Sequence, residues 1–82
     1  MQTLIRVPMQ LGDLLRNARQ QQGLTLADVA RQLGVSVQAV SKLEHNAERA
    51  SFERIHRLCL VLGLELVLQG RQAAKSDSAA EW

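Results

Sequence analysis

The chain has 82 residues, a formal net charge of +2 at neutral pH and 46% hydrophobic residues, nearly all of them aliphatic. A domain this small buries only about 60% of its unfolded surface, so helix packing or association must add stability. With one Phe, one Trp and no Tyr, an aromatic platform for single-stranded nucleic acid is not expected. A single Cys fits a reducing compartment, and no apolar run reaches the ~20 residues of a membrane span. We therefore expect a cytoplasmic protein without a signal peptide or membrane contact.

The chain begins with a short stretch, residues 3–7, whose residues favour extended structure. Pro8 follows and is tolerated in a first helical turn. Helical spacing then predicts a first helix at about residues 9–22, which Gly23 ends. Its apolar face consists of Leu11, Leu14, Leu15 and Ala18.

Two short helices separated by a glycine-containing turn are predicted next, at residues 26–33 and 37–45. Thr25 and Ser36 are N-cap residue types, and each stands immediately before its helix. Gly34 can adopt the left-handed conformation that ends the first of them. Val40 and Leu43 would face back towards the first helix of this pair. Such an arrangement within about twenty residues is typical of the helix-turn-helix motif, whose second helix enters the major groove of DNA.

A fourth helix is predicted at residues 52–62, after a polar loop and a capping Ser51. Its expected buried stripe is Phe52, Ile55, Cys59 and Leu62, so that Cys59 would be a small buried hydrophobe. Residues 64–69 then alternate as a β-strand does, with Leu64, Leu66 and Leu68 on one face. A lone strand needs a partner, which is either the same segment of a second copy or residues 3–7. We favour the symmetric two-stranded ribbon of a homodimer.

The fold class predicted is therefore mainly α, with four helices and one C-terminal strand that pairs across a dimer. Residues 1–70 would form the DNA-binding and dimerisation domain. Residues 71–82 are small and polar without periodicity, so we expect a flexible tail.

Two groups of side chains are candidates for DNA contact. Base edges would be met by the start and middle of the second motif helix, and among these Gln38 can both donate to and accept from adenine. Phosphates would be met by the helix start and the polar loop. The predicted base-contacting residues are Val37, Gln38, Ala39, Ser41 and Lys42, and the predicted phosphate-contacting residues are Thr25, Ser36, His45, Asn46 and Arg49. A further four arginines, Arg16, Arg31, Arg54 and Arg57, are interpreted either as phosphate contacts or as plain surface.

Arg19 and Glu44 stand near the core faces of their predicted helices. Because a buried charge needs a partner, we expect them to form a structural salt bridge. No other residue set indicates a reactive site. His45, His56 and Cys59 do not make a zinc set, and no nucleophile with a base or glycine-rich phosphate loop is present. We expect no enzyme, metal, cofactor or small-molecule substrate.

The segment LTLADVARQLGVSVQAVSKLEHN resembles the Xre/Cro-type, lambda-repressor-like helix-turn-helix family, and the pair of Arg19 and Glu44 matches that family's helix-to-helix salt bridge. Pro8, the ARQQQG at the end of the first helix, the LGLELVL strand and the final Glu81-Trp82 together resemble HipB-type antitoxins. Family members usually have Gln where this chain has Leu26, and often where it has Val37. These departures shift the expected base readers to Gln38, Ser41 and Lys42.

The resemblance implies a bacterial, nucleoid-associated homodimer that binds a palindromic operator in its own promoter. It also implies a HipA-type Ser/Thr kinase toxin as partner, with Trp82 as a contact for the toxin or part of a protease entry point. Two alternatives remain open at this stage. One is a free-standing repressor without a toxin, and the other is an interaction module that has lost DNA binding.

Overall fold

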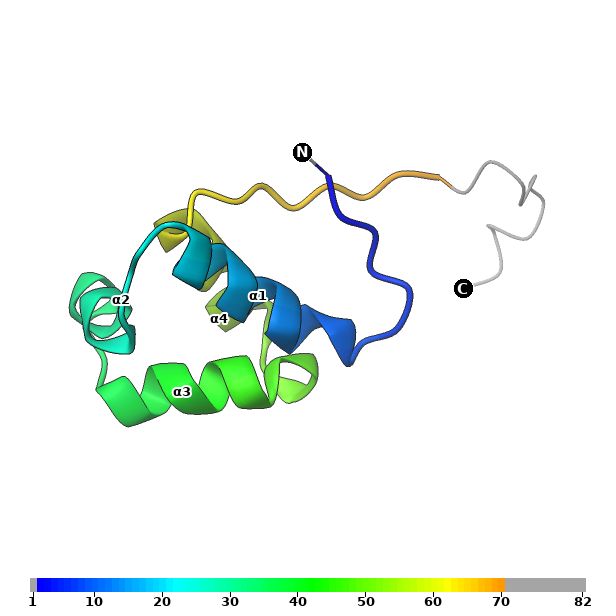
Figure 1. Cartoon of the computed structure of the whole chain (residues 1–82). Helices are drawn as coiled ribbons and strands as arrows, with labels where there is room; N and C mark the ends of the chain where they lie inside the picture. The colour runs from blue at the N-terminus through cyan, green and yellow to red at the C-terminus, as the bar shows by residue number, and fades with distance from the viewer. Residues whose placement is uncertain (1, 71–82) are drawn as a thin grey trace.

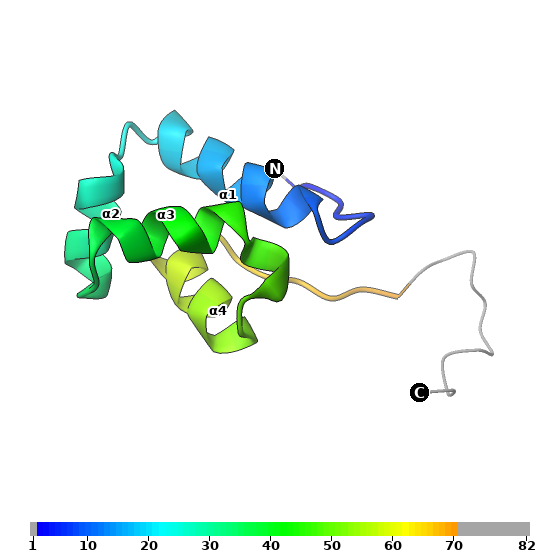
Figure 2. The same cartoon turned by 90° about the horizontal axis from the view of Figure 1, so that it is seen from below.

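The computed structural model describes residues 2–70 of the chain. Within this range the elements are α1 (Gln10–Gln21), α2 (Leu26–Leu33), α3 (Val37–His45), the 3-10 turn η1 (Ala47–Arg49) and α4 (Phe52–Val61). The helix α3 runs along one side of the bundle, α1 and α4 lie on its other side, and α2 lies at one end (Figures 1 and 2). The four predicted helices are confirmed, with ends that shift by one residue for the first and the last.

Local signals explain where the helices start and stop. Ser51 accepts a hydrogen bond from the backbone N–H of Arg54 at 3.3 Å, which confirms it as the cap of α4. The chain leaves α1 and α4 through Gly23 and Gly63, whose φ angles of 72° and 71° are in the left-handed region that favours glycine. The amide of Gln22 also donates to the carbonyl of Leu62, which ties the end of α1 to the end of α4.

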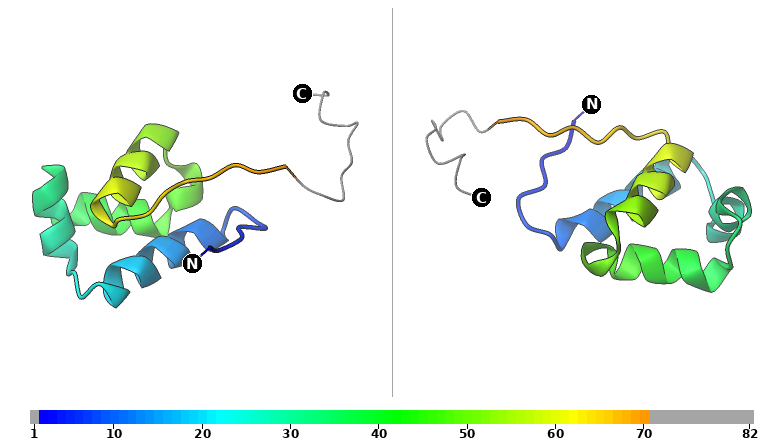
Figure 3. Two further views of the ribbon diagram at one scale, coloured as in Figure 1. Left: turned by 90° about the horizontal axis from the view of Figure 1, so that it is seen from above. Right: turned by 180° about the vertical axis from the view of Figure 1, so that it is seen from behind.

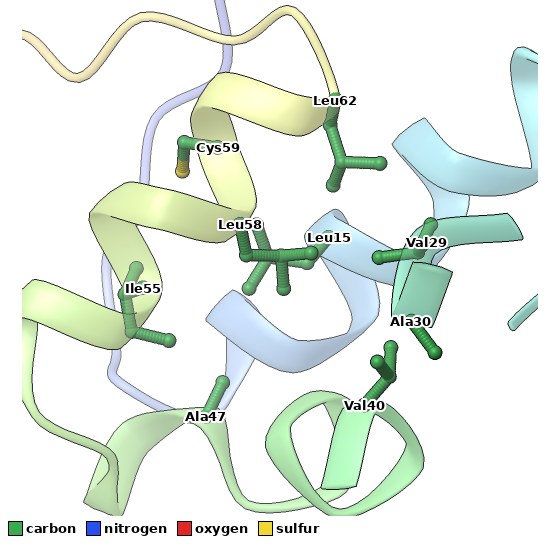
Figure 4. Packing of buried hydrophobic residues seen from close by; sticks show 9 residues of the cluster. All are labelled: Leu15, Val29, Ala30, Val40, Ala47, Ile55, Leu58, Cys59 and Leu62. Carbon is green, nitrogen blue, oxygen red and sulfur yellow. The ribbon is translucent and has the colours of Figure 1, made fainter. Parts of the chain in front are cut away.

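One hydrophobic core joins all four helices and η1 (Figure 4). Leu15 of α1 and Leu58 of α4 meet near its centre, and Val29 and Val40 bring in the two motif helices. Within residues 2–70 the buried apolar residues of this core are Leu15, Val29, Ala30, Val40, Ala47, Ile55, Leu58, Cys59 and Leu62. Cys59 is confirmed as a buried hydrophobe, and its burial raises the pKa of the thiol and so disfavours the reactive thiolate.

The prediction that Phe52 is buried was wrong, because 71% of this residue is exposed. Phe52 is the first residue of α4, and Cα–Cβ bonds tilt towards a helix's N-terminus, so its ring projects past the core. It stacks instead on His56, with ring centroids 5.8 Å apart. Leu58 completes the buried stripe of α4 in its place.

Residues 64–70 continue as a single extended segment beside the bundle (Figure 3). Within residues 2–70 no strand is formed, so the strand at 64–69 and its pairing across a dimer stay predictions. Leu64 is partly buried against the core, whereas Leu66 and Leu68 are exposed. Residues 3–7 are likewise unpaired, and the side-chain oxygen of Gln10 accepts from the backbone N–H groups of Arg6 and Val7. The described residues contain no helix long and apolar enough to span a membrane.

Candidate nucleic-acid interface

The turn between α2 and α3 is built from caps on both sides. Gly34 takes φ 74° and donates from its backbone to Ala30, as does Val35, so that the end of α2 is closed. The hydroxyl of Ser36 then accepts from the backbone N–H of Ala39 at 3.1 Å and starts α3. Both helices are thus held at the turn by hydrogen bonds within the motif itself.

The start of α2 has a full capping box that sequence reasoning missed. The Thr25 hydroxyl accepts from the Asp28 backbone N–H at 3.0 Å, and the Asp28 carboxylate accepts from the Thr25 backbone N–H at 2.8 Å. The bond from the Thr25 backbone N–H to the Asp28 carboxylate lowers the pKa of Asp28 most, and the Thr25 side chain and the guanidinium of Arg31 at 2.7 Å lower it further. An acid three residues after Thr25 was the available signal for this box.

We expect Asp28→Asn to lower the melting temperature at pH 7, and the difference from the wild type to vanish in acid. Because the folded pKa of Asp28 is lowered, its stabilisation is present above the ordinary aspartate pKa of 3.8. It is lost as the pH falls through the lowered pKa of the folded state. Below that pKa the wild-type carboxyl group is protonated and therefore uncharged, as the amide of the variant is. Thermal melts of both proteins between pH 7 and pH 2 measure this. A difference in melting temperature that stayed constant with pH would contradict a stabilising role of the Asp28 carboxylate.

The outer face of α3 carries a set of exposed polar side chains. The residues Gln38, Ser41, Lys42 and His45 recur at helical spacing, and together with Asn46 they line one shallow depression. Three of the predicted base contacts and two of the predicted phosphate contacts therefore share one surface, which we call the recognition face: Gln38, Ser41, Lys42, His45 and Asn46.

The other predicted contacts lie around this face rather than on it. Val37 stands at the first position of α3 with 42% of its surface exposed. Ala39 lines a neighbouring groove together with Arg49 of η1. Thr25 and Ser36 are both exposed at the starts of α2 and α3, where backbone N–H groups point outwards. Trp82 lies outside the described residues.

Arg19 and Glu44 form the ion pair expected from the sequence, behind the recognition face. Nε of Arg19 donates to Oε2 of Glu44 at 2.7 Å and Nη2 to Oε1 at 3.3 Å, and Nη1 donates to the Leu24 carbonyl at 2.9 Å. Nε of Arg16 adds a second cation 3.7 Å from Glu44. Glu44 is 3% and Arg19 9% exposed, so this pair is a buried connection between α1 and α3.

Gly12 of α1 is a second contact point with α3, and sequence reasoning did not find it. A methyl group built there would lie 2.3 Å from the backbone carbonyl oxygen of Glu44. Glycine at this position therefore permits the close approach of α1 to the end of α3. No local signal identifies such a residue, because the constraint comes from the backbone of Glu44, more than thirty positions further along the chain.

The described residues offer little other chemistry. Between Gln2 and Gly70 no group of three or more His, Cys, Asp or Glu side chains could hold a metal ion. What the arrangement does offer is an exposed helix with amide, hydroxyl and ammonium groups, fixed rigidly on a core. Such a helix, preceded by a capped helix and a tight turn, defines a helix-turn-helix DNA-binding domain.

Comparison with known proteins agrees with this class. The helix-turn-helix family model matches residues 15–69, and the chain belongs to this family, in its Xre-type branch. Antitoxin HipB of Escherichia coli O6:H1 is 26% identical over 74 residues, which span 90% of this chain and 79% of HipB. Transcriptional regulator ClgR of Mycobacterium tuberculosis is 38% identical over 74 residues, which span 85% of this chain and 66% of ClgR.

Solved structures of HipB have the same fold. A HipB-O4 20mer complex superposes with a TM-score of 0.76 at 25% identity, covering 84% of this chain and 97% of that one. A HipA-HipB-O2-O3 complex superposes with a TM-score of 0.75 at 25% identity, again covering 84% of this chain and 97% of that one. The chain is thus a DNA-binding regulator of the Xre family, similar to both an antitoxin and a transcriptional regulator.

Proposed function

We propose that this protein is an antitoxin that binds operator DNA as a homodimer, represses its own operon and neutralises a HipA-type Ser/Thr kinase. The observation that carries the DNA-binding part is the recognition face, a polar surface on a helix that a buried ion pair fixes to the core. Similarity to HipB over most of both chains supports the antitoxin part, and so does the likeness to HipB as it stands in the HipA-HipB-O2-O3 complex.

Within this proposal the recognition face enters the major groove. Gln38 is the base reader, because its amide can donate to N7 and accept from N6–H of adenine or otherwise pair with a base edge. Lys42 and Ser41 reach either a base or a phosphate. Thr25, Ser36, His45, Asn46 and Arg49 position the protein on the sugar-phosphate backbone, which sets register and affinity without reading sequence.

We expect Gln38→Ala to weaken operator binding by about 1–3 kcal/mol, the usual discrimination of a good side-chain pair with a base. Binding to unrelated DNA should be nearly unchanged, since the variant keeps every cation. Titrations of labelled duplexes at one salt concentration measure both affinities. Gln20→Ala is the matched control, because it removes an exposed amide from α1 instead of α3. An equal loss on both duplexes would mean that Gln38 does not read a base.

The antitoxin part of the proposal predicts a kinase partner and is tested separately from DNA binding. A HipA-type kinase encoded beside this gene should co-purify with the chain, and its autophosphorylation should fall when the chain is added. Trp82 is the proposed toxin contact, so Trp82→Ala should reduce co-purification, while operator DNA should still be bound. A gene neighbourhood without a kinase, or a kinase that stays active in the chain's presence, would overturn this part alone.

A free-standing repressor is the second candidate function. The specific observation in its favour is the 38% identity to the transcriptional regulator ClgR, which exceeds the 26% identity to HipB. Both functions share the recognition face and differ only in the toxin. The kinase experiment therefore separates them, and Gln38→Ala tests what they have in common.

A further inference from the structure

A groove of about 600 Å³ lies beside the recognition face, between α3 and α4. Its floor is apolar, and Leu33, Val35 and Leu43 contribute the largest side chains. Val35 is 44% exposed, although it is a hydrophobic residue at the centre of a tight turn. The floor is an unfilled apolar surface, which favours an occupant with an apolar group.

The rim of the groove is cationic. Lys42, Arg49, Arg54 and Arg57 line it, and among residues 2–70 no carboxylate belongs to its lining. Three other arginines in the part described, Arg16, Arg19 and Arg31, have acidic partners and Arg6 has none, and no ion pair within residues 2–70 involves the four cations of the rim. The groove thus suits an occupant that is both acidic and apolar, which a DNA phosphate backbone is not.

The chain itself contains one segment of this chemistry outside the described residues. Residues 77–82, DSAAEW, combine the carboxylates of Asp77 and Glu81 with the indole of Trp82. The six residues from 71 to 76 join this segment to Gly70 and can span about 20 Å when extended. Residues 64–70 also run towards the end of the molecule at which η1 lies (Figures 1 and 2).

We propose that residues 77–82 dock in this groove of their own chain. The indole of Trp82 covers the floor at Val35 and Leu43, and the carboxylates of Asp77 and Glu81 meet the guanidinium groups of Arg54 and Arg57. Tethering makes the contact intramolecular, with an effective concentration in the millimolar range for a short linker. Because Lys42, Asn46 and Arg49 line the groove and are also predicted DNA contacts, docking and DNA binding oppose each other.

Fluorescence tests this docking directly, because Trp82 is the only Trp and the chain has no Tyr. We expect the full chain to emit to the blue of N-acetyltryptophanamide and to be quenched more slowly by acrylamide. In Arg54→Glu/Arg57→Glu the emission should move to the wavelength of the free amide and the quenching rate should rise to its value. The control Arg6→Glu/Gln20→Glu adds negative charge at two exposed positions outside the groove and should behave as the wild type.

Both positions in the groove variant are exposed, and an acid at position 54 stands where the Ser51 cap favours one, so the variant is expected to fold. Circular dichroism checks this. Three results would overturn the proposal: a wild-type emission already at the free-amide wavelength, a blue-shifted emission retained in the groove variant, or a blue shift lost on dilution, which would assign the contact to a second copy. No DNA or toxin is present, so this test fails or succeeds separately from the proposed function.

Discussion

Glu44→Ala is expected to destabilise the domain by about 3–5 kcal/mol at pH 7, because it leaves the buried guanidinium of Arg19 without its counter-charge. The remaining bond from Arg19 to the Leu24 carbonyl satisfies one donor but not the charge. Urea unfolding at equilibrium measures the loss.

The control for this prediction is the exposed pair of Asp13 and Arg16, whose oxygen and nitrogen lie 3.4 Å apart. Asp13→Ala should cost less than about 1 kcal/mol, since water screens an exposed pair. The double change Arg19→Met/Glu44→Leu should recover most of the stability lost in Glu44→Ala, because no charge is then buried alone. A loss below 1 kcal/mol for Glu44→Ala would contradict the structural role of the pair.

Leu66→Asp is expected to turn the proposed dimer into a monomer and to reduce operator affinity by about 10²–10⁴-fold. Two linked half-sites gain avidity of this size from being bound together, and a monomer loses it. The charge falls on the leucine face of the predicted ribbon, where Leu66 is exposed in the single chain. Sedimentation and operator titration measure the two effects.

Val67→Asp is the matched control for the dimer prediction. It introduces the same charge one residue later, on the opposite face of the predicted strand, and should leave association largely intact. A Leu66→Asp variant that still sedimented as a dimer would assign the interface to another surface.

The motif helices could be predicted closely because their signals are local. Thr25 and Ser36 each bond to the helix that they begin, and Gly34 closes the turn through its own backbone. Each of these hydrogen bonds joins two residues that are only a few positions apart in the sequence, so the sequence pattern alone indicates it. The pair of Arg19 and Glu44 was predictable for a different reason, since charges at core positions require each other.

Other features depend on distances between elements and carry no local signal. The exposure of Phe52 follows from where the core ends around α4, and the close approach at Gly12 follows from the position of α3. The groove with its arginine rim brings together residues from α2 to α4. The strand at 64–69 stays a prediction, because a strand needs a partner to satisfy its backbone and no such pairing is formed within residues 2–70.

The central claim is that the recognition face binds a specific operator, and the most direct test is titration of the DNA upstream of the gene against a scrambled duplex across salt. We predict at least about 10³-fold preference for the upstream DNA, and an affinity that falls steeply between 50 and 200 mM salt as phosphate counterions are released. Equal affinity for the two duplexes, or no binding at the lowest salt, would contradict the claim.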